Sequence, residues 1–364
     1  MAAKPKYLQV ADILRREIAE GVFRDGDKLT TEEELRFRFR VSRQTVRQAI
    51  AQLEDDGLVD RRRGSGTYVR HGPRKRQGLL RVGVLTSYMT DYISPMILSG
   101  MEETLNDNNA VMVLSSTRND PKLERSLLER MLDGQVDGLI VEGCRTAEKT
   151  PNADCYLRLA ERNIPVLFMN AYYREMEQTP HLVMDDYGGG RQAAEELIRR
   201  GYRRLGGFFK TDDLQGLERA RGFREALTDL NIPFAEKDVL TFTTEDRMNL
   251  FQTRESADFV RMLTEERTFD GLVCYNDIFA AQLIEDLRKG GMKLPEELGI
   301  ISFDNAEISG LCHPGLTTLA HPKQRFGVRA AEKMLAMLEG RKEESETMKW
   351  TLVERESAPD RKGR

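Results

Sequence analysis

The chain is poor in the residues that most often form disulfides or hold metals. Its four cysteines contain no Cys-x-x-Cys pair, and its four histidines show no His-x-x-x-His spacing. We therefore expect reduced, mostly buried thiols, a cytoplasmic location, and neither a metal ion nor a cofactor. No apolar run approaches the ~18–20 residues of a membrane span. The basic N-terminal residues lead into no hydrophobic segment of a signal peptide, so we expect no contact with a membrane.

Motifs of catalysis and phosphate binding are missing as well. The run Gly188-Gly189-Gly190-Arg191 lacks the Lys-Ser/Thr of a phosphate loop, and no Gly-x-Ser-x-Gly sequence occurs. The neighbouring carboxylates Asp185-Asp186 and Asp212-Asp213 do not by themselves place two carboxyl groups across a glycosidic bond. These absences argue against an enzyme.

The length and the charge distribution indicate more than one domain. A chain of 364 residues suits two or three domains, and 40% hydrophobic with 32% charged residues is typical of a soluble globular protein. Residues 1–76 hold 18 Lys and Arg against 12 Asp and Glu, a net charge of +6, whereas the remainder holds 38 against 48, a net charge of −10. A basic head on an acidic body predicts that the head meets nucleic acid.

The first seventy residues carry the pattern of a winged helix-turn-helix. Apolar residues recur at helical spacing over 7–20, Thr31 with Glu34 forms a capping box for a second helix to Phe39, and a third helix runs from Ser42 to about Asp56. Strands are expected at 58–60 and 67–69 around a glycine-rich turn. We predict a DNA-binding domain over 1–70 and an exposed linker over 71–79.

The third helix and the wing are the predicted DNA contacts. Ser42 is a good N-cap, and a helix presented to the major groove reads bases with its N-terminal residues. Arg and Gln on these turns suit guanine and adenine. The predicted DNA-binding residues are Ser42, Arg43, Gln44, Thr45, Arg47, Arg63, Gly64, Ser65 and Gly66.

From residue 80 to the C-terminus the pattern changes to alternating strands and helices. Strand runs that are apolar throughout and separated by helices imply parallel sheets covered on both faces, hence an α/β fold. Two successive series suggest two similar lobes with a cleft between them. The expected strands are 81–86, 110–114, 138–141, 165–169, 205–209, 239–242, 271–275 and 299–303, and the helices are 97–106, 121–132, 189–200, 217–230 and 278–289.

The head resembles the GntR family of winged-helix regulators. The resemblance rests on Gln9-Val10, on Ser42-Arg43-x-Thr45-Val46-Arg47 and on Gly64-x-Gly66-Thr67-Tyr68-Val69. One departure is that Thr30-Thr31-Glu32 replaces the family's Pro-Ser/Thr-Glu. Another is Glu33, which stands where the family often has a phosphate-binding Arg.

The body resembles the periplasmic-binding-protein-like effector domain of the lactose/galactose repressor family. With the GntR-type head it is similar to the family of arabinose-operon repressors, through stretches such as 137–142, 209–213, 241–245 and 274–277. The resemblance implies a homodimeric repressor that binds two half-sites of operator DNA and is released by L-arabinose. Another pentose or a nucleoside is the alternative effector. A sugar-processing enzyme would need a poised acid–base pair, and the sequence shows none. A transport binding protein would need a signal peptide, which we do not expect here, and would not need a basic head.

Polar residues that directly follow apolar strands are the candidate effector ligands, because ligands of such sheets bind beyond the carboxyl ends of the strands. By resemblance, Arg219 is the sugar-clamping arginine, His321 is a polar cleft residue and Tyr92 closes the cleft. The predicted effector-binding set is Tyr92, Glu142, Asn170, Lys210, Gln215, Arg219, Asn276, Asp304 and His321.

Each of these residues also has a structural interpretation. Asn276 and Asp304 could cap the turns that follow them. Arg219 could form a surface ion pair with Glu218, and His321 could make a hydrogen bond in a segment that crosses between the lobes.

Overall fold

The computed structural model describes residues 5–19, 21–24, 26–55, 57–62, 65–69, 79–246 and 254–362. The chain divides into two compact units, one built on the first 78 residues and the other on most of the remainder. Among the described residues, no helix combines the length and the apolar character needed to cross a membrane. The predicted linker over 71–79 lies outside the described residues except for Leu79.

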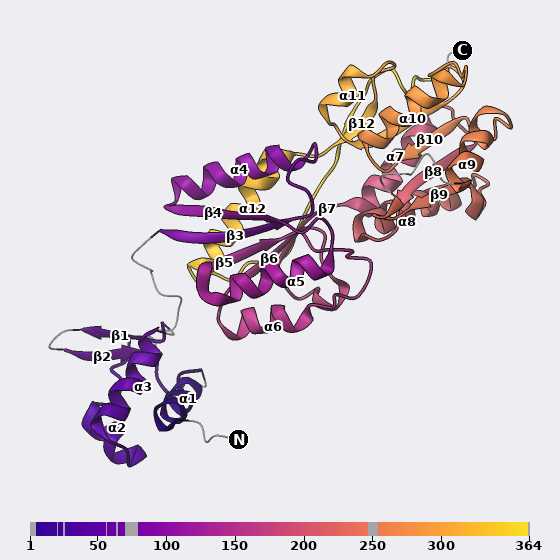
Figure 1. Cartoon of the computed structure of the whole chain (residues 1–364). Coiled ribbons are helices and arrows are strands. Elements are labelled where there is room, and N and C mark those ends of the chain that lie inside the picture. The colour runs from indigo at the N-terminus through magenta and orange to yellow at the C-terminus, as the bar shows by residue number, and fades with distance from the viewer. Residues whose placement is uncertain are drawn as a thin grey trace. The chain divides into compact units, whose positions relative to one another are not determined.

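The head is the predicted winged helix-turn-helix (Figure 1). Its elements are α1 (Lys6–Ala19), α2 (Glu32–Phe39), α3 (Arg43–Asp55) and the antiparallel strands β1 (Val59–Arg62) and β2 (Gly66–Val69). The capping box of α2 is present, because Glu34 N donates to Thr31 Oγ1 at 3.3 Å and Thr31 N donates to Glu34 Oε2 at 2.9 Å. The three helices bury one apolar core that includes Leu14, Leu35 and Val46.

The first lobe of the body is a six-stranded sheet, parallel throughout, in the order β13-β7-β6-β5-β3-β4. Helices α4 and α12 lie on one face of the sheet, and α5 and α6 lie on the other (Figure 1). The elements are β3 (Leu80–Thr86), α4 (Ser94–Asp107), β4 (Ala110–Ser116), α5 (Pro121–Arg130), β5 (Gly138–Val141), α6 (Ala153–Glu161), β6 (Val166–Asn170), β7 (His181–Met184), α12 (Lys323–Leu338) and β13 (Glu346–Met348).

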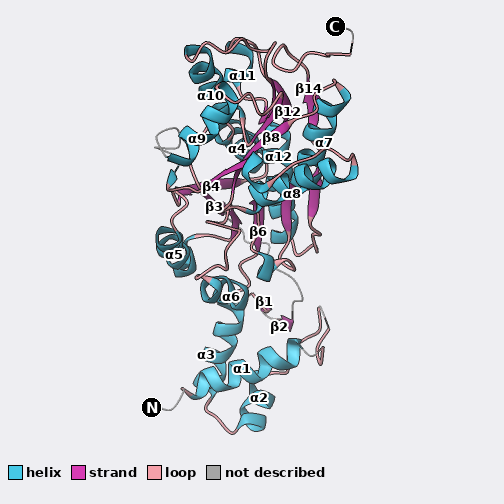
Figure 2. Cartoon of the chain, turned by 90° about the vertical axis from the view of Figure 1, so that its right-hand side faces the viewer, coloured by secondary structure: helices cyan, strands magenta, loops and turns pink. Residues whose placement is uncertain are grey.

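The second lobe has a similar sheet in the order β14-β12-β11-β10-β8-β9, in which only β14 runs antiparallel to its neighbour. Figure 2 labels the strands β8, β12 and β14 of this sheet. One apolar cluster joins α9 and α10 to this sheet. The elements are α7 (Asp186–Arg199), β8 (Leu205–Lys210), α8 (Leu214–Asp229), β9 (Val239–Phe242), α9 (Arg254–Thr264), β10 (Gly271–Cys274), α10 (Asp277–Lys289), β11 (Gly299–Asp304), α11 (Glu307–Leu311), β12 (Thr317–Ala320) and β14 (Thr351–Val353).

Glycines allow the helices of each lobe to pack at close range. A Cβ atom added at Gly327 of α12 would collide with the Ile97 carbonyl of α4. One added at Gly222 of α8 would collide with the Tyr187 carbonyl of α7. Because well-packed backbone cannot yield to an extra methyl group without cost, these positions fix the helix pairs that frame each lobe.

The structure differs from the prediction in two ways: several helices begin earlier, and several helices and strands were not predicted at all. Three helices of the body begin three residues before the predicted ranges, at Ser94, Asp186 and Leu214. Two of these starts have side-chain caps, since Asp185 accepts from Gly188 N and Asp213 accepts from Gly216 N. The elements that the sequence analysis did not assign are α6, β7, α9, α11, β12, α12, β13 and β14.

Candidate functional sites

The first turns of α3 present the polar surface that the sequence predicts. Arg43, Gln44 and Arg47 are exposed, whereas Val46 on the other face is buried. Thr45 N donates to Ser42 Oγ at 3.1 Å, so Ser42 is the N-cap. The two hydroxyl groups lie 2.8 Å apart and are held locally, so Arg43, Gln44 and Arg47 form the exposed polar surface of these turns.

Glu32 is a residue of this surface that the sequence analysis missed. Its carboxylate accepts from Arg43 Nε at 3.1 Å and from Arg47 Nε at 3.0 Å. Partial burial raises the pKa of Glu32, but the hydrogen bonds from the two arginines outweigh this and bring it below its usual value. Both arginines contact the Glu32 carboxylate through Nε.

The wing is held by a small polar and aromatic cluster. Ser65 Oγ lies 2.6 Å from Tyr68 Oη, and the Arg62 guanidinium lies 4.5 Å from the centre of the Tyr68 ring. Gly66 has a φ angle of +125°, a conformation that favours glycine. Arg63 and Gly64, also predicted to contact DNA, lie outside the described residues.

A cavity of about 110 Å³ lies between the two lobes of the body. It sits beyond the carboxyl ends of strands of both sheets, where the α/β architecture predicts a ligand. Since one water needs roughly 10–15 Å³ of such a volume, the cavity has room for a ligand of several heavy atoms. Eight of the nine predicted effector residues line it: Tyr92, Glu142, Lys210, Gln215, Arg219, Asn276, Asp304 and His321.

Arg219 is buried in the wall of this cavity, so the interpretation as a surface ion pair is wrong. Its side chain is 4% exposed; Nε donates to Asp186 Oδ1 at 2.8 Å and Nη1 donates to the Tyr275 carbonyl at 2.7 Å. The guanidinium also lies 4.3 Å from the Phe303 ring centre and 4.9 Å from that of Trp350. Among the described residues, no acceptor is hydrogen-bonded to Nη2. This nitrogen of a firmly held arginine can therefore donate to a ligand in the cavity.

The charges of Arg219 and Asp186 depend on each other. Burial raises the pKa of Asp186 to about 7, although the nearby guanidinium favours the ionised carboxylate. A buried carboxylate is stable only when it is paired and hydrogen-bonded. Asp186 is therefore the residue that keeps Arg219 in place, and it was absent from the predicted set.

Lys210 lines the cavity but already has two anionic partners. Its Nζ lies 2.8 Å from Asp212 Oδ1 and 2.9 Å from Asp213 Oδ2, and Tyr275 Oη donates to the same Asp213 oxygen at 2.8 Å. Burial alone would lower the pKa of Lys210, but the two carboxylates outweigh it and raise the pKa. The ammonium group is therefore charged and neutralised within the protein.

Asp304 and Tyr92 connect the two lobes across the cavity. Tyr92 Oη, from the loop after β3, donates to Asp304 Oδ2, at the end of β11, at 2.5 Å. Burial raises the pKa of Asp304, while Arg219 and the Tyr92 hydroxyl lower it, and the net shift is upward. Asp304 does not cap the next helix, because the N-cap of α11 is Ala306.

His321 offers two unpaired ring nitrogens. The side chain is buried at 6% exposure, and neither Nδ1 nor Nε2 has a hydrogen-bond partner among the described residues. Burial, followed by the positive charges of Lys323 and Arg219, lowers the pKa of His321 to about 3. A neutral imidazole has one donor and one acceptor nitrogen, which is the pairing that a hydroxyl group needs. The alternative of a crossover hydrogen bond finds no partner among these residues.

Glu142 and Asn170 form a held pair at the first lobe's side of the cavity. Glu142 accepts from Thr86 Oγ1 at 2.8 Å, from Ser87 N at 2.7 Å and from Asn170 Nδ2 at 3.1 Å. Asn170 is the one predicted residue that does not line the cavity. It lines a second, more open hollow of about 450 Å³, and Gln215 lines both.

Asn276 combines the two roles that the sequence left open. Its Oδ1 accepts from Phe279 N at 3.0 Å and so caps α10, while the residue also lines the cavity. Its neighbour Asp277 is buried and accepts from Ser302 Oγ, Thr318 Oγ1 and Ala306 N. Burial raises the pKa of Asp277 to about 7. Among the described residues, His, Cys, Asp and Glu side chains form no group of three that could hold a metal ion.

Both parts of the chain match known protein families. Residues 6–69 match the model of bacterial regulatory proteins of the gntR family, and residues 194–358 match that of a periplasmic binding protein-like domain. The chain is similar to a solved periplasmic binding protein/LacI transcriptional regulator from Alkaliphilus metalliredigens, bound to D-xylulofuranose. The TM-score is 0.65 at 23% identity, over 76% of this chain and 98% of that one. The fold and these matches define a transcription regulator with a winged-helix head and a two-lobed body.

Relatives along the full length narrow this class. The chain is 39% identical to the arabinose metabolism transcriptional repressor of Geobacillus stearothermophilus, over 93% of this chain and 92% of the relative. It is 33% identical to that of Halalkalibacterium halodurans, over 92% of this chain and 89% of the relative. The chain belongs to the family of arabinose metabolism transcriptional repressors. Membership of a repressor family is also the ground for regarding the chain as a regulator and not as an enzyme.

Proposed function

We propose that the cavity between the lobes binds L-arabinose and that this sugar releases the repressor from its operator. The observation that carries the proposal is the state of the charges around the cavity. Arg219 is paired with Asp186, and Lys210 is paired with Asp212 and Asp213.

These pairings favour an uncharged ligand. A phosphorylated sugar would bring a charge into a buried site whose cations already have partners, at a high desolvation cost. The groups left for a ligand are neutral or already compensated, such as the imidazole of His321 and the outer nitrogen of Arg219. Such a set of donors and acceptors suits the hydroxyl groups of a pentose, and the named relatives make arabinose the favoured pentose.

We further propose that the protein acts as a homodimer, with each head reading one half-site of the operator through α3. Half-sites about one DNA turn apart would match such a dimer. Sugar binding then shifts the population toward a state in which the heads fit the operator poorly. This shift requires that the sugar bind the two states with different affinities.

Calorimetry of the full chain against L-arabinose, other pentoses, nucleosides and arabinose 5-phosphate tests the effector. We expect binding of L-arabinose and none of the phosphate ester. Tight binding of the phosphate ester would refute the charge argument, and a response only to a nucleoside would replace the named effector. Two measurements test the dimer. Ultracentrifugation of the free protein should show a dimer, and a gel shift should show weaker binding to operators in which half a DNA turn has been inserted between the half-sites.

A further inference from the structure

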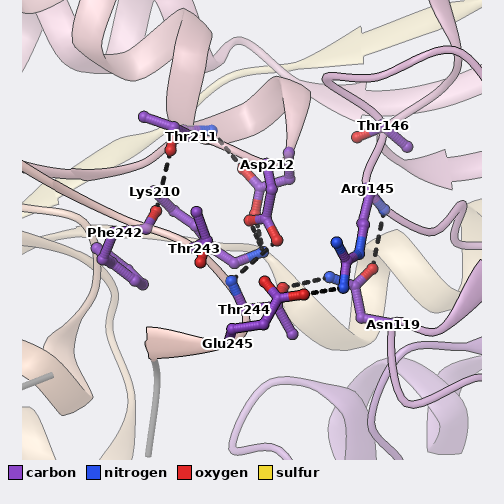
Figure 3. A network of polar contacts seen from close by, with 12 residues as sticks. Asn119, Arg145, Thr146, Lys210, Thr211, Asp212, Phe242, Thr243, Thr244 and Glu245 are labelled. Atoms are coloured by element: carbon purple, nitrogen blue, oxygen red, sulfur yellow. Dashed lines mark hydrogen bonds and ion pairs between the residues drawn. The ribbon is translucent and has the colours of Figure 1, made fainter. Parts of the chain in front are cut away.

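A second set of contacts joins the lobes beside the effector cavity (Figure 3). On the first lobe, Asn119 follows β4 and Arg145 follows β5; on the second, Thr244 and Glu245 follow β9. Asn119 Nδ2 donates to Thr244 Oγ1 at 2.5 Å, and Arg145 forms an ion pair with Glu245. We call these four residues the clasp.

Asn119 organises the first lobe's half of the clasp. Its side chain is buried, and while Nδ2 reaches Thr244, Oδ1 accepts from Arg145 N at 2.9 Å. One amide thus links two loops of the first lobe and one loop of the second. Asn119 and Arg145 both have left-handed backbone angles, with φ of 56° and 46°, a conformation that asparagine adopts readily and arginine seldom.

The second lobe's half of the clasp leads to the cavity wall. Thr244 N donates to Asp212 Oδ2 at 2.9 Å, and Asp212 Oδ1 lies 2.8 Å from Lys210 Nζ (Figure 3). Lys210 and Asn119 both line the cavity, whereas Thr244 and Glu245 do not. The contacts therefore run without a break from one wall of the effector site, through Asp212 and Thr244, back to the other lobe.

We infer that the clasp holds the lobes closed over the bound effector and so sets the effector's affinity and residence time. This rests on the proposed function, in which the cavity binds the sugar. The clasp bonds exist only when the lobes are together, so they stabilise the closed form alone. Since the apparent dissociation constant rises as the closed fraction falls, clasp residues that do not line the cavity also change the affinity for the sugar. Thr244, Arg145 and Glu245 do not line the cavity and are therefore positioning residues.

The two bonds of the clasp differ in weight. Arg145 and Glu245 have side chains that are 30% and 59% exposed, and exposed ion pairs contribute little to stability. The Asn119–Thr244 bond has a buried donor and a half-buried acceptor, and a hydrogen bond contributes more where it is less exposed to water. We therefore expect Thr244 to be the sensitive position and the ion pair to be secondary.

Thr244→Val and Thr244→Ser form a matched pair for the test, because valine keeps the shape and serine keeps the hydroxyl. In the full chain, we expect Thr244→Val to weaken L-arabinose binding about 3–10-fold, mainly through faster release, and Thr244→Ser to stay within about twofold of the parent. Without sugar, neither variant should bind the operator more weakly than the parent. Titration calorimetry measures the affinity for L-arabinose, stopped-flow mixing measures its release, and a gel shift measures the operator affinity.

Arg125→Gln is the control, because it breaks an exposed ion pair with Asp154 inside the first lobe and should leave sugar release unchanged. Equal affinity and release for Thr244→Val and the parent, or equal losses for the valine and serine variants, would overturn the clasp. If the parent does not bind L-arabinose, the proposed function fails by itself. Hydrogen exchange then tests the clasp without ligand: residues 117–119 and 243–246 should lose protection in Thr244→Val and keep it in Thr244→Ser, and equal protection would refute it.

Discussion

Replacing Arg219 by alanine should disturb both the stability of the body and its affinity for the sugar. Arg219 and Asp186 are 4% and 6% exposed, so the variant leaves a buried carboxyl group without its partner. Removing one member of a buried ion pair costs about 3–5 kcal/mol of the free energy of unfolding. Losing a charge-assisted donor to the ligand costs roughly 1.5–3 kcal/mol, which is at least about tenfold in affinity.

A second substitution separates the two effects. Asp186→Asn in the Arg219→Ala background removes the ionisable group, so it should recover part of the stability without restoring the sugar contact. Burial raises the pKa of Asp186 to about 7 even beside the guanidinium, and it must rise further without it. A carboxyl group whose folded pKa exceeds the unfolded value stabilises the protein below the unfolded pKa, and this contribution is lost as pH rises through the folded pKa. The stability gap between single and double variant should therefore widen from pH 5 to pH 8.

Urea denaturation at pH 5, 7 and 8 measures this gap, and calorimetry with L-arabinose under conditions where each variant is folded measures the affinity. Equal stabilities of the single and double variants at pH 8 would show that Asp186 is not held by Arg219. A double variant that binds L-arabinose as tightly as the parent would show that Arg219 does not contact the sugar.

Other changes probe the head, the cavity and the helix packing. Arg43→Ala and Arg47→Ala should each weaken operator binding by about 1–3 kcal/mol at matched salt in a gel shift, and unchanged affinity of both would refute the recognition-helix assignment. Glu32→Gln should lower the ratio of operator to non-operator affinity roughly 3–10-fold, because the two arginines lose their support. Burial depresses the pKa of His321 to about 3, so the folded protein loses stability as pH falls below the unfolded pKa of about 6.5. His321→Gln should therefore reduce by about 2 kcal/mol the decrease in unfolding free energy between pH 6.5 and 5, measured by urea titration. Gly327→Ala should destabilise the first lobe by about 1–3 kcal/mol in the same assay.

The head was predictable because its signals are local. The capping box of Thr31 and Glu34, the N-cap at Ser42 and the apolar spacing of α3 each lie within a few residues of the element that they define. The same holds for the eight parallel strands of the body that were predicted as short apolar runs, whereas β7 and β12, which are also parallel, were missed. Where the signal was weaker, as for β13 and β14, three-residue strands at the sheet edges escaped notice.

The strand-end rule gave five of the candidate effector residues, and four of the five line one cavity, but the rule could not say what each would do there. Asn170 is the last residue of β6, yet its amide supports Glu142 and the residue lines the second hollow. Asn276 caps α10 while it lines the cavity. The direction of a side chain at a strand end depends on neighbouring strands and helices, which the order of residues along the chain does not specify. Their contacts with a sugar stay predictions.

The partners that were missed all come from distant parts of the chain. Asp186 and Arg219 are 33 residues apart, and Asn119 and Thr244 are 125 residues apart. Each of these residues taken alone has an ordinary local explanation, such as a helix start or a loop hydrogen bond. Only the packing of α7 against α8 joins the first pair, and only the approach of the lobes joins the second. Because the second pair forms only where the two lobes meet, the same feature that hid it from the sequence makes it suited to respond to a ligand that binds between the lobes.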